Sequence, residues 1–122
     1  MRLHRERRPL HWQLREPGSK LAECIRREDA NQPLLIDALG GFTAVHLDRN
    51  DLQWEQEAED LVQSLLTRRR PTVIVIEETG WGVVPSTMIG GLFRDRQGWL
   101  AQRLEQHAAD SWLVVQGRAL NL

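Results

Sequence analysis

The sequence is most informative at Val73-Ile-Val-Ile-Glu-Glu-Thr-Gly-Trp-Gly-Val-Val-Pro85. Its four leading β-branched residues predict a buried strand. Glu77 and Glu78 come next, at the carboxyl end of that strand, where open α/β sheets place their ligands. Gly80 and Gly82 permit backbone conformations, or a close approach of a ligand, that a side chain would forbid. The stretch therefore predicts one wall of an active site, with a tight strand-to-helix turn carrying solvated acids as the alternative.

The composition is that of one soluble globular domain covering residues 1–122. Hydrophobic residues make up 41% of the 122 residues and charged residues 27%, and the net charge is −1. This near-neutral balance argues against nucleic acid or an acidic membrane surface as the partner. No apolar run approaches the roughly 18–20 residues of a membrane span. The lone Cys24 and the absence of a signal-peptide pattern at the N-terminus favour the cytoplasm.

Helical periodicity is clearest from Asp51 onward, where apolar residues recur on one face until Pro71 stops the helix. A second long helix is expected over 87–108, capped by Ser86, although glycines near 90 and 98 weaken it. A short helix over 20–28 is expected behind Ser19 as its cap. The segment 38–50 has helical spacing, but Gly40 and Gly41 leave its structure open.

Three short apolar runs separate these helices. Leu34–Ile36 predicts a strand ending at Asp37, 73–77 predicts the second strand, and 111–115 predicts the third. The order strand, helix, strand, helix, strand favours a parallel sheet with right-handed crossovers.

Several residues are candidates for phosphate chemistry. Asp37 ends a buried strand, where an acid holds Mg²⁺ through water in nucleotide-binding α/β proteins; the alternative is an ordinary solvated strand end. His4 lies in a basic arm, 1–17, beside Arg5 and Arg8. A neutral imidazole can attack phosphorus while guanidiniums hold a triphosphate, but a frayed basic tail has the same composition. Arg94 can reach a phosphate or be plain surface charge.

Two common site types find no support in the sequence. The chain contains no Gly-x-x-x-x-Gly-Lys-Ser/Thr, so it carries no P-loop motif. His11, His46 and His107 show no paired spacing with other histidines or cysteines, which argues against a zinc site.

Short motifs in one order carry a resemblance to a known family. The N-terminal segment has His4-Arg-Glu-Arg-Arg-Pro9, then Trp12 and Glu16, and the glycine turn is Glu78-Thr-Gly-Trp-Gly-Val-Val-Pro85. Together with Leu35-Ile-Asp37, Phe93-Arg-Asp95, Gly98, Gln102-Arg-Leu104 and Trp112-Leu-Val-Val-x-Gly117, they resemble the bifunctional adenosylcobinamide kinase / adenosylcobinamide-phosphate guanylyltransferases of cobalamin biosynthesis.

The resemblance implies a three-layer RecA-like fold of the P-loop NTPase type and two reactions. The family phosphorylates adenosylcobinamide and then transfers GMP from GTP through a guanylylated histidine. Nucleotides (GTP and ATP), Mg²⁺ and a corrinoid are the implied small molecules. His4 matches the nucleophile, Asp37 the Mg²⁺-associated acid and Glu78 the acid of the glycine turn.

The chain also departs from the family pattern. About fifty residues with the first strand and P-loop precede the histidine segment in the family, judged against a domain of usual size. The residue before the turn's acid is Glu77 instead of Asn, and a polar run is replaced by 38–45. We therefore expect a fold truncated at its N-terminus. These departures have three explanations: the chain is a fragment of an enzyme, it is a degenerate relative, or it pairs with another chain that closes the sheet.

The functional expectation is an impaired kinase and guanylyltransferase. The alternative is a non-catalytic nucleotide-binding or subunit-interaction domain. An open sheet edge would favour a homo-oligomer.

Overall fold

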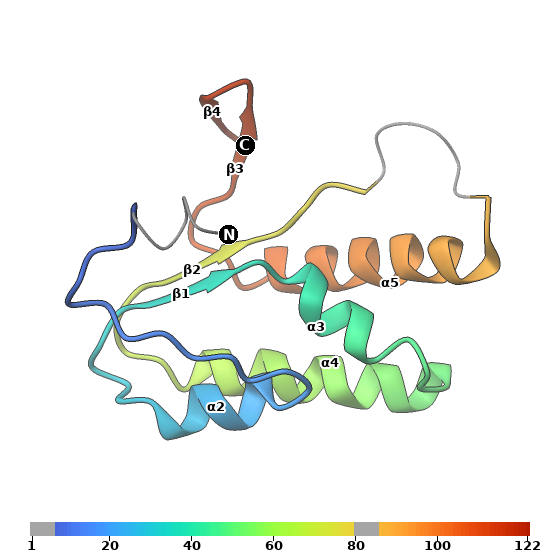
Figure 1. Ribbon diagram of the computed structural model, residues 1–122, viewed down its shortest axis with the longest axis horizontal. Coiled ribbons are helices and arrows are strands. Elements are labelled where there is room, and N and C mark those ends of the chain that lie inside the picture. Colours follow the sequence, from blue (N-terminus) through green and yellow to red (C-terminus); the bar gives the residue numbers. More distant parts are fainter. Residues whose placement is uncertain (1–6, 80–85) are drawn as a thin grey trace.

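The computed structural model describes residues 7–79 and 86–122 (Figure 1). Helices alternate with short strands along the chain, as the sequence predicts. The elements are α2 (Leu21–Arg27), β1 (Leu34–Asp37), α3 (Gly40–Val45), α4 (Asp51–Leu66), β2 (Thr72–Val75), α5 (Met88–Glu105), β3 (Trp112–Val115) and β4 (Arg118–Asn121).

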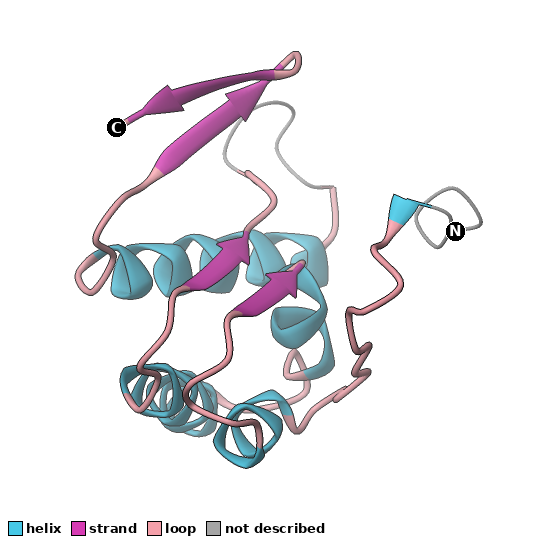
Figure 2. Cartoon of the chain, turned by 90° about the vertical axis from the view of Figure 1, so that its left-hand side faces the viewer, coloured by secondary structure: helices cyan, strands magenta, loops and turns pink. Residues whose placement is uncertain are grey.

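The central sheet consists of β1 and β2, which pair in parallel with Ile36 opposite Ile74. This confirms the two predicted strands and their direction. Side chains alternate across a strand, so Ile36 and Ile74 face the helices and the core. Leu35 and Val73 face the other way and are 45% and 57% exposed. Within the described residues, helices thus cover one face of this sheet (Figure 2).

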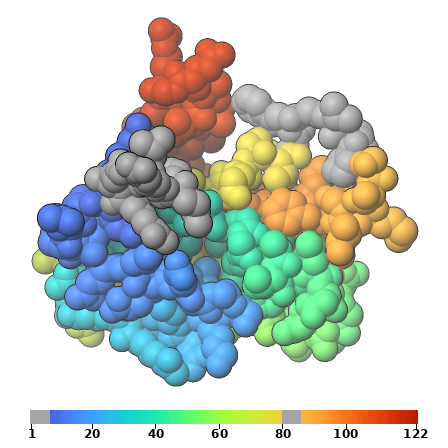
Figure 3. Space-filling view, viewed as in Figure 1, coloured from blue at the N-terminus to red at the C-terminus, as the bar shows by residue number. Residues whose placement is uncertain are grey.

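The predicted third strand forms at β3 but does not join the parallel sheet, so that part of the prediction is wrong. It pairs instead with β4, which the sequence analysis did not predict, in a separate antiparallel hairpin. Gln116 and Gly117 both have positive φ, 52° and 73°, and two such residues in a row suit a tight two-residue hairpin turn. The hairpin protrudes from the body of the molecule (Figure 3).

The core is built mainly on α4. Its predicted apolar face is confirmed, since Trp54, Ala58 and Leu61 are buried. The helix ends at Leu66, before Pro71. Arg68 lies beyond this end and donates hydrogen bonds to the carbonyls of Glu28 and Gln32.

Two predicted helix caps are displaced by one residue. The N-cap of α2 is Lys20, whose side chain makes no capping bond. The N-cap of α5 is Thr87, whose hydroxyl accepts a hydrogen bond from the Gly90 N–H at 3.0 Å. Ser19 and Ser86 therefore lie one position outside the caps. α5 runs unbroken to Glu105.

Polar residues join α3, α4 and α5 inside the core, which the apolar stripe of α5 did not predict. Arg96 and Gln97 are 5% and 1% exposed. Arg96 donates to the carbonyls of His46 and Arg49 at 2.9 and 2.8 Å, and the Thr43 hydroxyl donates to Gln97 at 2.6 Å. In the ranges 7–79 and 86–122, no helix is long and apolar enough to cross a bilayer.

Candidate functional site

The carboxyl ends of β1 and β2 bring the predicted acids to one edge of the sheet. Asp37 is the last residue of β1 and lies opposite Val75, the last residue of β2. Glu77 and Glu78 follow Val75 after one intervening residue. Asp37 and Glu78 are exposed. Because parallel strands end at the same edge, this edge is where an α/β sheet presents ligand-binding groups.

The loop after β1 is tied to the chain after β2. The Leu39 N–H donates to the Val75 carbonyl at 2.9 Å. The Gly40 N–H donates to Oε1 of Glu77 at 3.2 Å. Gly40 is buried and begins α3. One main-chain and one side-chain hydrogen bond therefore hold the segment from Asp37 to Gly40 against the chain at the end of β2.

Glu77 is a residue whose contribution the sequence analysis missed. It was noted only as an acid at a strand end and as a departure from the family pattern. Its position directly after the β-branched run was the available signal. Its partner, Gly40, lies 37 positions away in the sequence, and no periodicity links two such residues.

Four predicted site residues fall outside the described residues: His4, Arg5, Gly80 and Gly82. Arg8 is described and is half-buried.

Arg94 lies near the start of α5 and forms an ion pair with the next residue, Asp95. Its Nη2 and Nε donate to Oδ1 of Asp95 at 3.2 and 3.3 Å. An exposed pair of this kind contributes little stability, roughly 0–1 kcal/mol. The guanidinium can therefore exchange Asp95 for a phosphate at small cost.

The donor set at the strand ends consists of carboxylate oxygens, which suits Mg²⁺. In the described part of the chain, no three His, Cys, Asp or Glu residues gather as a metal cage. Magnesium does not require such a cage, because it usually keeps several waters and binds one or two carboxylates together with substrate phosphates. Asp37 fits this kind of binding.

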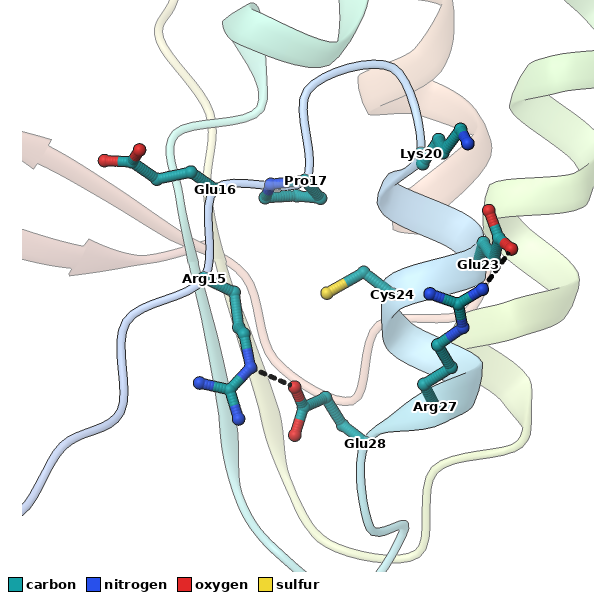
Figure 4. Close-up of a pocket in the computed structure, with 8 residues that line it drawn as sticks. All are labelled: Arg15, Glu16, Pro17, Lys20, Glu23, Cys24, Arg27 and Glu28. Atoms are coloured by element: carbon teal, nitrogen blue, oxygen red, sulfur yellow. Dashed lines mark hydrogen bonds and ion pairs between the residues drawn. The ribbon is translucent and has the colours of Figure 1, made fainter.

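A hollow lies between the arm and α2 (Figure 4). It has a volume of about 390 Å³, and none of the predicted site residues that the structure describes lines it. Its charges are largely paired within the wall, since Arg15 contacts Glu28 at 2.7 Å and Arg27 contacts Glu23 at 2.6 Å. These pairs leave no excess positive charge for a triphosphate.

Comparison with known proteins gives a consistent result. The sequence matches the family described as cobinamide kinase / cobinamide phosphate guanyltransferase over residues 1–122. It is 31% identical to the bifunctional adenosylcobalamin biosynthesis protein CobU of Escherichia coli (strain K12), covering 93% of this chain and 71% of that protein. It is 32% identical to the corresponding protein CobP of Pseudomonas aeruginosa, covering 98% and 70%. CobU of Salmonella typhimurium is 32% identical, covering 93% and 71%.

Proposed function

Because the chain belongs to the cobinamide kinase / cobinamide phosphate guanyltransferase family, we propose that it acts in cobalamin biosynthesis as a guanylyltransferase. The supporting observation is the parallel pairing of β1 with β2, which places Asp37 and the acids after β2 at one edge. This is the edge where such sheets bind nucleotides. We extend the proposal to the fold, in which β1 and β2 belong to a three-layer RecA-like sheet.

The proposed reaction has two steps. An imidazole nitrogen of His4 forms a bond to the α-phosphorus of GTP, and the bond to the bridging oxygen breaks, so that pyrophosphate leaves. A phosphate oxygen of adenosylcobinamide phosphate then attacks the same phosphorus, and the phosphorus–nitrogen bond breaks to release the imidazole. Mg²⁺, when bound, offsets phosphate charge.

The remaining residues hold the substrates. Asp37 and Glu78 would hold Mg²⁺ at the strand ends and position the incoming phosphate there. Arg5 and Arg8 stabilise the charge that develops on the phosphates, and Arg94 is a further phosphate contact. The glycines Gly80 and Gly82 let the main chain approach the nucleotide.

Labelling with α-³²P-GTP and Mg²⁺ tests this proposal. We expect acid-labile label on the wild-type chain and background labelling of His4→Ala. His11→Ala is the matched control, because His11 lies on the same arm, is exposed, and should keep full labelling. Label that survives His4→Ala would exclude His4 as the nucleophile, and an unlabelled wild type would contradict the transferase proposal.

We also predict that this 122-residue chain has little or no kinase activity. Phosphoryl transfer depends on a phosphate cradle and its lysine for electrostatic stabilisation, and the sequence contains no P-loop motif. The measurement is transfer of γ-³²P from ATP or GTP to adenosylcobinamide. Substantial transfer would contradict this prediction without affecting the guanylylation test.

A second candidate is a domain that binds nucleotide without turning it over. It is favoured by the segment 38–45, which replaces the polar run of the family pattern and buries Phe42 and Thr43 in the core. Titration calorimetry with GTP and GMP separates the candidates. Binding without labelling supports this second function, and labelling excludes it.

A further inference from the structure

The contact between Gly40 and Glu77 has a close steric fit as well as a hydrogen bond. Oε1 of Glu77 accepts the Gly40 N–H at 3.2 Å. The other carboxylate oxygen lies where residue 40 would carry a Cβ, so any side chain there would overlap Oε2. The neighbouring Gly41 has open space at the same point. With the Glu77 carboxylate in this position, residue 40 has no room for a side chain, whereas residue 41 has.

This contact lies between the two acids of the proposed site. Gly40 is three residues after Asp37, and Glu77 directly precedes Glu78. The Asp37 end of this loop is fixed by the ladder between β1 and β2. The other end is fixed where Leu39 and Gly40 meet the chain after β2. A hydrogen bond to a charged acceptor is stronger than one between neutral groups.

We propose that Glu77 is a positioning residue that sets the spacing between Asp37 and Glu78 by holding the Gly40 main chain. Its carboxylate acts through the loop, so it does not itself need to touch metal or nucleotide. This inference rests on the proposed function of Asp37 and Glu78 in binding Mg²⁺ and phosphate. The contact itself is a separate claim that can be tested without any activity.

The first experiment observes the Gly40 amide directly by ¹H–¹⁵N NMR. In the wild type, this amide should be protected from exchange with solvent, because its N–H donates to the Glu77 carboxylate. Glu77→Ala should shift the Gly40 amide resonance and speed exchange of the amide with solvent by at least about tenfold. A Gly40 amide that does not respond to Glu77→Ala would overturn the proposal.

The second experiment measures the Mg²⁺-dependent affinity for GTP by calorimetry. Glu77→Ala should weaken it by at least about tenfold, corresponding to the loss of a charge-assisted bond. Glu77→Gln keeps an acceptor oxygen and should bind within about threefold of wild type. If Glu77→Gln binds GTP as weakly as Glu77→Ala, the Glu77 carboxylate would instead be a direct metal ligand. That result would overturn the positioning role.

The glycines supply a matched pair of variants. Gly40→Ala should displace the carboxylate without unfolding the protein, because the end of a flexible side chain can move aside. It should lower GTP affinity as much as Glu77→Ala, and the double variant should be no weaker than either single one. Gly41→Ala should match wild type. Additive losses in the double variant would contradict a shared mechanism.

The two levels of the proposal fail differently. If wild type binds no GTP in the presence of Mg²⁺ but the Gly40 amide responds to Glu77→Ala, the proposed function fails and the contact stands. If GTP binds but the Gly40 amide does not respond to Glu77→Ala, the positioning role fails and the proposed function stands.

Discussion

At the scale of single residues, the buried side chain of Arg96 makes several contacts at once. Its guanidinium bonds the carbonyls of His46 and Arg49 and lies over the Trp54 ring, 5.5 Å from the ring centroid. It also contacts Asp51 at 3.2 Å. A guanidinium spreads its N–H donors over a rigid planar fork that reaches separate acceptors, whereas an ammonium group concentrates its three donors at one point. Arg96 therefore connects α5 to the ends of α3 and α4.

Arg96→Lys should lower the free energy of unfolding by about 1–3 kcal/mol, because a buried carbonyl is left without its donor. The measurement is urea unfolding followed by circular dichroism. Arg94→Lys, on the same helix, should change stability by less than about 0.5 kcal/mol, since Arg94 pairs only with its exposed neighbour. Equal effects of the two substitutions would show that the buried contacts of Arg96 contribute nothing.

At the scale of elements, α4 begins with a reciprocal cap. The Asn50 side chain accepts from the Gln53 N–H at 2.8 Å, and the Gln53 side chain accepts from the Asn50 N–H at 3.1 Å. This satisfies two donors that a helix start leaves unpaired. The middle of α4 is joined to α5 by an ion pair between Glu59 and Arg103. Gln63 and then Arg103 hold the pKa of Glu59 below its ordinary value by hydrogen bonding to its carboxylate.

Asn50→Ala should lower the free energy of unfolding by about 0.5–2 kcal/mol, the usual effect of losing an N-cap. Thermal and urea unfolding both measure it. Gln56→Ala, at an exposed position in the same helix, is the control and should stay within about 0.5 kcal/mol. If Asn50→Ala leaves the free energy of unfolding unchanged, water replaces the hydrogen bonds of the cap at no cost in stability.

At the scale of the whole molecule, the parallel sheet has an apolar face that the described residues leave uncovered. Leu35, Val73 and Val75 are exposed on it. A short sheet with free edges and an exposed apolar surface promotes association. The homo-oligomer expected from the sequence thus remains a prediction, with a defined surface on which to test it.

We expect the chain to associate in a concentration-dependent way in light scattering coupled to gel filtration. Val73→Lys should shift the population toward monomer, since it places a charge on the uncovered face. Leu52→Lys, at an exposed apolar position on α4, should leave association unchanged. A wild type that is monomeric at all concentrations would contradict the prediction.

Much of the fold follows from the sequence. The β-branched run predicts β2, the run at 34–36 predicts β1, and the apolar period from Asp51 predicts α4, because each pattern is local and repeats at the spacing of its element. The motif order predicted the family, which the comparisons confirm. The acids at the strand ends follow from strand direction. The roles of all the predicted site residues stay predictions, for Asp37, Glu78, Arg8 and Arg94 as well as for His4, Arg5, Gly80 and Gly82.

Tertiary structure decided what no local pattern encodes. The turn at Gln116 and Gly117 pairs β3 with β4, where alternation alone had predicted a parallel sheet. The buried position of Arg96 depends on carbonyls of the connection between α3 and α4. The contact of Gly40 with Glu77 joins residues 37 positions apart. Sequence periodicity reports which face of an element is apolar, whereas hydrogen-bond partners and strand neighbours depend on where the chain returns in space.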